Sequence, residues 1–363
     1  MSTCDAPSTY NNHCFASTPR LMTLFFGAGA LALIFLTGLV SGEWVWTTRA
    51  HVQMVTSRLM CAPTVVQSSP PLSSATQISA KSDLQLVEKE VQPEKRYEGF
   101  RAFLQKYPQA EQAQYAREQL NATRVMLIFE YREAGKLEDA FRVGTEFLKE
   151  QATFKKNEDE LLVCITLGEE AGRLSLKGNF QHLGAGELFA RQAIALIDAG
   201  QKIQTTKEWD ASKTRFLSQM YQTIGVANFK DHKFDDAVLS LSRSIEFNCR
   251  DPFSYYLASL VYQEQYFEAA TQFNSFPDKQ SSDARLALSK ARASAAKAAE
   301  FMAKTIVVCE SCMTAGDKES ATYGKLLTSC RTDIEDPFRV SHNNKLDGLD
   351  EYIQSMRARI CSK

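Results

Sequence analysis

The stretch 221–249 constrains the fold of this chain more than any other part of the sequence. It is written YQTIGVANFKDHKFDDAVLSLSRSIEFNC, and its apolar residues recur mostly three and four positions apart on both sides of the polar segment 231–233. Apolar residues at this spacing lie on one face of an α-helix, so we predict two amphipathic helices joined by a tight turn. Gly225, Ala237 and Ser244 are small residues at positions where the two helices must approach each other closely.

This pattern resembles the tetratricopeptide repeat (TPR), a helical hairpin of about 34 residues. The resemblance covers most signature positions, although Asn228 stands where the family usually has tyrosine and Cys249 where it usually has proline. One hairpin cannot bury its own apolar faces, so the resemblance implies stacked neighbours on both sides. It implies an all-α fold in which the hairpins form a right-handed α-solenoid. A chance amphipathic hairpin is the alternative interpretation.

Similar patterns flank the central hairpin. Downstream, the segments 253–262 and 266–273 repeat its plan with a turn that is one residue shorter. Upstream, the segment 126–140 shows the same turn and places Ala140 at the small position, whereas the segment between matches weakly and has a turn enlarged over 177–186. Because a terminal repeat needs a cover for its last apolar face, we expect the alanine-rich segment that follows the repeats to form a capping helix.

Residues 21–40 form a run of 20 residues without a charge. As a helix this run spans about 30 Å, which is the thickness of the hydrocarbon core of a bilayer. Trp44 and Trp46 follow at the position of an interfacial aromatic belt. We therefore predict a transmembrane anchor over residues 21–42. The main alternative is a signal peptide cleaved at residues 40–42, which offer small side chains, although its apolar region would be unusually long; a buried core helix is the other alternative.

The orientation of the predicted anchor is weakly determined. Arg20 and the terminal amine lie on one side of it, while Arg49 and Arg58 lie on the other, so the positive-inside rule nearly cancels. We expect the repeats to lie outside the cytoplasm, because a signal anchor followed by a long exported domain is a common bacterial arrangement. The opposite arrangement resembles the outer-mitochondrial import receptors. Ala28 and Ala32 form a small-xxx-small pair through which two anchors could pack as a homodimer.

Composition separates the anchor from the helical part of the chain. The segment 62–83 contains three prolines and six serines with few large apolar residues, which is typical of a semi-extended linker. The predicted organisation is a mobile tail over 1–20, an anchor over 21–42, a juxtamembrane segment and linker over 43–84, TPR-like repeats over 85–277 and a C-terminal helical extension over 278–363.

The charge balance gives no indication of a nucleic-acid partner. Forty-two basic and 43 acidic residues give a formal net charge of −1. We identify no clustered basic face in the sequence, so we expect no nucleic-acid binding. The nine cysteines do not identify a redox compartment, and their odd number leaves at least one without an intramolecular disulfide partner.

The spacing of Cys309 and Cys312 supports a second hypothesis, a thiol-dependent redox or metal-handling protein. Two observations weigh against it. A structural zinc site needs about four ligands, and the nearest histidine is His342. The two cysteines also lie inside a predicted helix, whereas a redox pair of this spacing usually begins a helix. Buried or incidental helical cysteines are therefore the favoured interpretation.

No catalytic motif is recognised in the sequence. The five histidines are scattered without an i, i+4 pair, and there is neither a phosphate-binding glycine loop nor a nucleophile elbow. The adjacent carboxylates Glu169 and Glu170, like Asp235 and Asp236, are predicted to be solvated on helix surfaces. We therefore expect a protein that is not an enzyme and that has no cofactor.

The resemblance implies where partners would bind. In TPR proteins the first helix of each repeat lines a concave groove that binds peptides or partner helices. The outward residues of these helices are the candidates for partner binding, with packing between repeats as the alternative role; they are Arg132, Gln222, Phe229, Lys230, Tyr256 and Gln263. The sequence thus predicts a membrane-tethered scaffold that recruits or assembles protein partners at a membrane.

Overall fold

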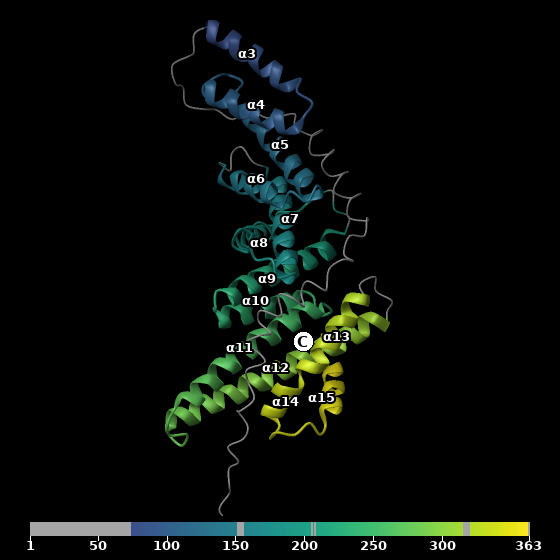
Figure 1. Ribbon diagram of the computed structural model, residues 1–363. Helices are drawn as coiled ribbons and strands as arrows, with labels where there is room; N and C mark the ends of the chain where they lie inside the picture. The colour runs from purple at the N-terminus through teal and green to yellow at the C-terminus, as the bar shows by residue number, and fades with distance from the viewer. Residues whose placement is uncertain (1–73, 151–155, 205, 207, 315–319, 362–363) are drawn as a thin grey trace, which may run out of the picture. The chain divides into compact units, whose positions relative to one another are not determined.

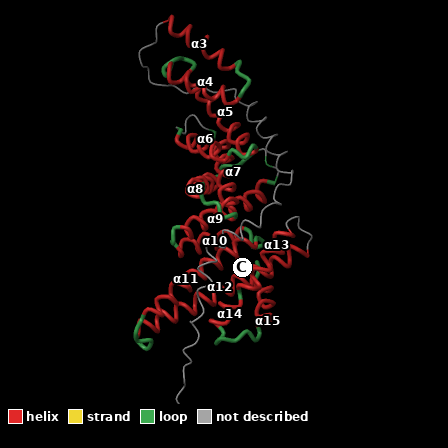
Figure 2. The backbone as a smooth tube through the Cα atoms, viewed as in Figure 1, coloured by secondary structure: helices red, strands yellow, loops and turns green. Residues whose placement is uncertain are grey.

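The computed structural model describes residues 74–150, 156–204, 206, 208–314 and 320–361. This part of the chain is built from helices and contains no β-strand, which confirms the all-α class (Figure 2). The helices, labelled as in Figure 1, are α3 (Ser74–Glu88), α4 (Pro93–Lys106), α5 (Ala113–Glu133), α6 (Leu137–Lys149), α7 (Asn157–Leu176), α8 (Leu183–Asp198), α9 (Trp209–Lys230), α10 (Phe234–Phe247), α11 (Pro252–Ser275), α12 (Ser282–Thr314), α13 (Ser320–Asp333), α14 (Glu335–Ser341), α15 (Leu349–Ser355) and the 3-10 helix η2 (Met356–Arg359).

The predicted anchor at 21–42 and the tail before it lie outside the described residues. Within the described part of the chain, no helix combines the length and the apolar character needed to cross a bilayer. The last part of the predicted linker differs from expectation, because α3 begins at Ser74. Ala80 and Leu84, four residues apart, are buried on one face of α3, which packs against α4. The segment from Ser74 on contains no proline before α4, so nothing interrupts this helix.

The chain divides into two compact units, and the division passes through α7 and α9. The N-terminal unit contains the described residues of 74–173 and 180–223. The C-terminal unit contains the described residues of 174–179 and 224–361.

The N-terminal unit consists of helices, several of which pack against their neighbours in the sequence. α4 packs against α5 and α5 against α6, with the large side chains of Phe100, Leu127 and Phe147 fully buried. Between α7 and α9 the packing depends on glycine. A Cβ atom on Gly168 would lie 2.7 Å from the Met220 sulfur, so a side chain there would require the Met220 side chain to shift.

The turn between α7 and α8 is shorter than predicted. α7 ends at Leu176 and α8 begins at Leu183, so the turn covers 177–182 instead of 177–186. Gly186 lies within α8, where an added Cβ would collide with Ala171 of α7. A glycine in a predicted turn is therefore a helix-packing residue here.

The central hairpin is confirmed by α9 and α10, which are separated by residues 231–233. The backbone N–H of Lys233 donates to the carbonyl of Asn228 at 2.9 Å and closes the turn. Gly225 faces α10, where an added Cβ would lie 2.7 Å from Leu241 Cγ and 2.8 Å from its Cδ2. The helices therefore approach at Gly225, as the sequence pattern predicts.

The downstream repeat differs from the prediction. α11 is one helix from Pro252 to Ser275, without a turn between the segments 253–262 and 266–273. The residues at the expected turn are Gln263, Glu264 and Gln265, which are good helix formers and continue the helix. The partner of α11 is α12, which packs along it. The boundary expected at 277/278 thus falls in the turn between two helices of one hairpin.

The predicted alanine-rich helix is confirmed as α12, while its role as the cap of a repeat array stays a prediction. Near the turn, Ala269 and Ala270 of α11 pack against Ala291 and Ala295 of α12, with Tyr266 beside them. Small side chains on both helices allow close helix packing.

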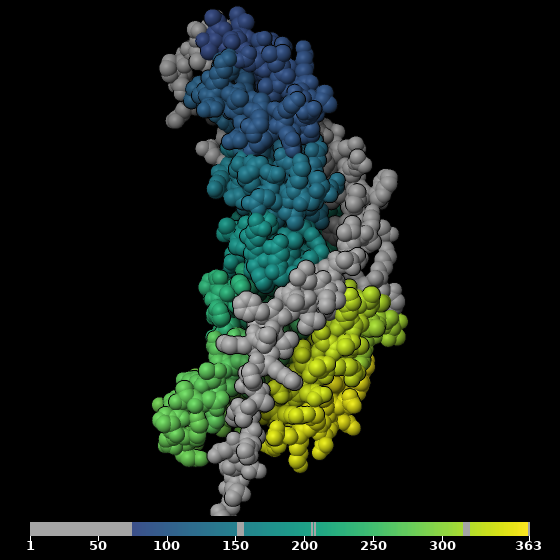
Figure 3. Space-filling view, in the orientation of Figure 1, coloured from purple at the N-terminus to yellow at the C-terminus, as the bar shows by residue number. Residues whose placement is uncertain are grey.

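The C-terminal helices cover the second half of α12 and form one continuous mass in the space-filling view (Figure 3). Their buried cluster includes Ile306 of α12, Leu326 of α13, Phe338 of α14 and Ile353 of α15. This cluster gives α12 the role of a central support in the C-terminal unit, because α13, α14, α15 and η2 all pack against it.

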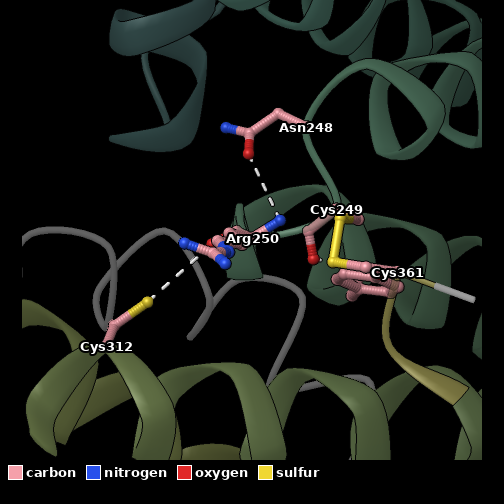
Figure 4. Close-up of a disulfide and its surroundings, with 6 residues drawn as sticks. Asn248, Cys249, Arg250, Cys312 and Cys361 are labelled. Atoms are coloured by element: carbon pink, nitrogen blue, oxygen red, sulfur yellow. Dashed lines mark hydrogen bonds between the residues drawn. A yellow bond between two sulfur atoms is a disulfide. The ribbon is translucent and has the colours of Figure 1, made fainter. Parts of the chain in front are cut away.

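A disulfide joins Cys249, which follows α10, to Cys361 after η2 (Figure 4). The two residues are 112 positions apart. In the chain-entropy model, closing a loop of this length stabilises the folded state by about 4–5 kcal/mol. The end of the described chain is thus attached covalently to the loop between α10 and α11.

Replacement of Gly225 tests the packing of the central hairpin. We expect Gly225→Ala to lower the free energy of unfolding of the full-length chain and Gly225→Leu to lower it further, by about 1–3 kcal/mol, because the new side chain overpacks the contact with Leu241. The control is Gly184→Ala in the first turn of α8, where an added Cβ meets no atom within 4 Å. Thermal unfolding should show an unchanged or higher Tm for the control. An unchanged Tm for Gly225→Leu would contradict the close approach.

Candidate functional site

Three helices of the N-terminal unit bring charged side chains to one place. α7 supplies Glu169, Glu170 and Arg173, while α5 supplies Arg132 and α9 supplies Arg215. Each of these helices is the first of two joined by a short turn. Residues 169 and 170 directly follow Gly168, where α9 approaches α7. The two carboxylates therefore lie beside a contact between helices and are largely shielded from solvent.

Glu170 is bound by two arginines. Its side chain is only 3% exposed, and it accepts hydrogen bonds from Arg173, with Nε at 3.1 Å and a second, shorter contact from Nη2. Arg132 Nε lies 3.5 Å from the same carboxylate. Burial raises the pKa of Glu170, but the hydrogen bonds and charge of Arg173, together with Arg132, outweigh it and leave the pKa below its ordinary value. Glu170 is therefore an ionised, buried partner for both guanidinium groups.

Glu169 has the opposite environment. The residue is half-buried as a whole, but its Oε1 atom is completely covered and has no hydrogen-bond partner in the described part of the chain. Burial raises the pKa of Glu169 to about 7, while the charges of Arg215 and Arg132 oppose the shift and that of Glu170 adds to it. The prediction that these two carboxylates are solvated is wrong, because their positions in the helix packing remove them from water.

This arrangement fixes the two arginines near the surface. Arg132 and Arg173 have side-chain exposures of 26% and 40%, so each guanidinium contacts a buried carboxylate on one side and solvent on the other. A guanidinium has five N–H donors in a planar fork. Because Glu170 already orders these groups, little side-chain entropy remains to be lost when they bind a carboxylate or a carbonyl oxygen.

Sequence analysis did not identify Glu169, Arg173 or Arg215 as site residues. One signal was available, since Gly168 and Gly172 are four residues apart and lie on the same face of a helix. Such a pair marks a face that another helix approaches closely. The charged residues next to it are then candidates for burial between helices.

The six predicted groove residues do not belong to one compact unit. Arg132 and Gln222 lie in the N-terminal unit, on α5 and α9. Arg132 takes part in the cluster described above. The side chain of Gln222 is half-buried. A partner-binding role for either residue stays a prediction.

The other four predicted groove residues lie in the C-terminal unit. Lys230 is exposed at the end of α9 and Gln263 is half-buried on α11. Phe229 packs across the hairpin turn, with its ring centroid 6.2 Å from that of Phe234. Tyr256 differs most from the prediction, because it packs against the buried cluster of the C-terminal helices and burial raises its pKa. Its position is that of a packing residue.

The thiols of the predicted CxxC segment have the character of buried cysteines. Cys309 is fully buried in α12, and burial raises its pKa to about 12, whereas a reactive thiol needs a lowered pKa. The Cys312 thiol is half-exposed and donates to the carbonyl of Arg250 at 3.8 Å (Figure 4). Within the described ranges there is no group of three or more His, Cys, Asp or Glu side chains with the geometry to hold a metal ion.

Comparison with protein-family models, with curated proteins and with solved structures finds no match for this chain. The resemblance to the tetratricopeptide repeat therefore stays a prediction that rests on the residue pattern. The functional argument has to come from the site itself.

Substitution of Glu169 tests the buried, unpaired carboxylate. The pKa of Glu169 is near 4.5 in the unfolded chain and about 7 in the folded chain. Between these two pH values the folded chain binds more protons at this position than the unfolded chain, so the free energy of unfolding falls as the pH rises. We expect Glu169→Gln to remove this loss. The variant should be more stable than the parent at pH 8, by at most about 3 kcal/mol, and similar to it at pH 5.

Urea unfolding of the full-length chain at both pH values measures the effect. The control is Glu98→Gln on α4, where the carboxylate is 65% exposed and pairs with Arg101 on the same helix. It should change the free energy of unfolding by less than about 0.5 kcal/mol at either pH. A Glu169→Gln variant with the parent's pH dependence would show that Glu169 is ionised and paired.

Proposed function

We propose that this chain is a membrane-tethered, non-enzymatic scaffold whose TPR-like hairpins form a right-handed α-solenoid and bind protein partners. The observation that carries the proposal is the charged cluster on α5, α7 and α9, where a buried carboxylate orders two half-exposed arginines. Successive first helices contribute to it, which is how a repeat protein builds a continuous binding face. The predicted anchor at 21–42 would hold this face near a membrane.

Charge and hydrogen-bonding geometry support binding to a protein segment. Arg132, Arg173 and Arg215 lie near two carboxylates, one of which, Glu169, is about half protonated at pH 7 because its pKa is raised to about 7. The local charge is therefore positive. An extended segment of a partner offers carbonyl and carboxylate oxygens, and both are acceptors for guanidinium donors.

The disulfide between Cys249 and Cys361 supports a location of the repeats outside the cytoplasm. Disulfides persist in oxidising compartments such as the periplasm and the cell exterior, and they are rare in the cytosol. Together with the predicted anchor, this favours a single-pass protein with an exported helical part.

Copurification from native membranes tests partner binding. We expect proteins that copurify in stoichiometric amounts with the full-length chain to be lost from Arg173→Glu, because the reversed charge repels Glu170 and the partner's acceptors. The matched control is Arg191→Glu on α8, an exposed arginine that pairs with Glu187 one turn away. The control should retain the partners. A fragment of residues 1–73, which lacks the helical part of the chain, shows which proteins copurify without it. If both full-length variants copurify only with the proteins that this fragment captures, the proposed function is wrong.

Protease access tests the location. In intact cells stripped of any outer barrier, an external protease should digest the chain after residue 74, and thiol trapping before lysis should show the Cys249–Cys361 bond already formed. Cys361→Ser supplies the gel position of the chain without this bond. Protection from the protease, combined with reduced cysteines, would place the repeats in the cytoplasm.

A further inference from the structure

The first half of α12 carries an exposed basic surface in the C-terminal unit. Between Ala284 and Ala299 this helix contains four basic residues and no acidic residue. All four are exposed, and they are Arg285, Lys290, Arg292 and Lys297. The prediction that the chain lacks a clustered basic face is therefore wrong, because the balanced charge of the whole chain conceals a local excess.

The helix period arranges these residues in two rows. Arg285 and Arg292 are seven residues apart and lie on one flank of the exposed face, while Lys290 and Lys297 lie on the other flank. The strip between the rows is formed by small or apolar residues, namely Leu286, Ser289, Ala293 and Ala296. The opposite side of the helix is buried. This surface therefore has a narrow uncharged centre and two basic edges.

The basic residues have few acidic neighbours. Arg285, Lys290 and Arg292 form no ion pair within the described residues. Lys297 pairs with Glu300 at 2.9 Å on the same helix, and the charge of Arg359 lies close enough to act on it. Glu300 is only 20% exposed and also pairs with Lys304 at 2.7 Å, so Lys297 is the one basic residue of the four whose charge is partly neutralised. The surface thus keeps a net positive charge that a ligand can neutralise.

We propose that this surface binds an acidic amphipathic helix of a partner protein. Small residues along the centre let a second helix approach closely, as on the buried side of the same helix. Acidic residues on the edges of the incoming helix would then meet the two basic rows, which is the pairing that fixes partner choice between helices. A membrane surface is less suited, because Leu286, 56% exposed, is the one large apolar side chain of the strip available to enter lipid.

Two synthetic helices test this proposal on the full-length chain in phosphatidylcholine nanodiscs. One fluorescein-labelled peptide carries leucine at heptad positions a and d with glutamate at e and g, and the matched peptide carries lysine at e and g. We expect the acidic peptide to bind, the basic peptide not to bind, and the affinity to fall as salt rises. Arg285→Glu with Arg292→Glu should weaken binding about tenfold or more, since two edge contacts become repulsive.

The matched control is Lys81→Glu with Lys89→Glu, which reverses two exposed charges in the N-terminal unit, one on α3 and one in the turn that follows it. This control should bind the acidic peptide like the parent. Circular dichroism of both double variants establishes that each is folded, and Lys290→Glu with Lys297→Glu provides a second test on the other row. Equal binding by all variants would overturn the proposal. So would flotation of the chain with phosphatidylglycerol vesicles together with no binding of the acidic peptide.

This surface is independent of the arginine cluster on α5, α7 and α9. Partners that copurify through Arg173 would support the proposed function whatever the peptide does. Binding of the acidic peptide through Arg285 and Arg292 would support this second surface even if no protein copurifies. The two failures can therefore be told apart.

Discussion

Close approach of helices at small residues is the constraint on which the rest of this structure depends. At Gly168 and at Gly225 a single added carbon atom would lie 2.7 Å from a side chain of the neighbouring helix. Where α10 meets α11, Ser244 and Ser254 are both fully buried and share a hydrogen bond of 2.8 Å, so even the polar groups at this contact are small and paired. Protein interiors are packed too densely to admit larger side chains at such points without displacement of a helix.

The charged cluster follows from this constraint. Once Gly168 brings α9 close to α7, the next two residues lie beside the contact, and both are glutamates. Desolvation raises the pKa of each, but only Glu170 receives guanidinium hydrogen bonds that reverse the shift. Two adjacent carboxylates on one helix thus differ in protonation near neutral pH because one side chain meets Arg173 and the other does not. Their sequence context is nearly identical, so the difference arises from tertiary contacts.

Local sequence patterns predict contacts between helices that are neighbours in the chain, but not contacts made by later parts of the chain. The hairpin of α9 and α10 was predictable because periodicity, a polar turn and Gly225 all indicate one arrangement. The continuous α11 was not predictable from the repeat pattern, because the aromatic residues near Tyr266 resemble the start of a second helix, whereas residues 263–265 contain no helix breaker and continue the first one. Tyr256 was predicted to line the groove, and this prediction failed for a related reason. A repeat pattern predicts which face of a helix points outward, but it does not show that a later part of the chain, here the cluster around Phe338, covers that face.

α12 shows how burial along one helix separates two roles. Its second half supports the C-terminal helices, of which α14 and α15 have only seven residues each. Helices this short are marginal alone, so they depend on packing at Ile306 and Phe338, and the Cys249–Cys361 disulfide restrains the chain end that follows them. Among the described residues, the first half packs through its alanine side, against α11 and Val340 of α14, and its opposite side is exposed. Its outer side can therefore carry charge without a desolvation cost, which is why the basic rows lie on this half of the helix.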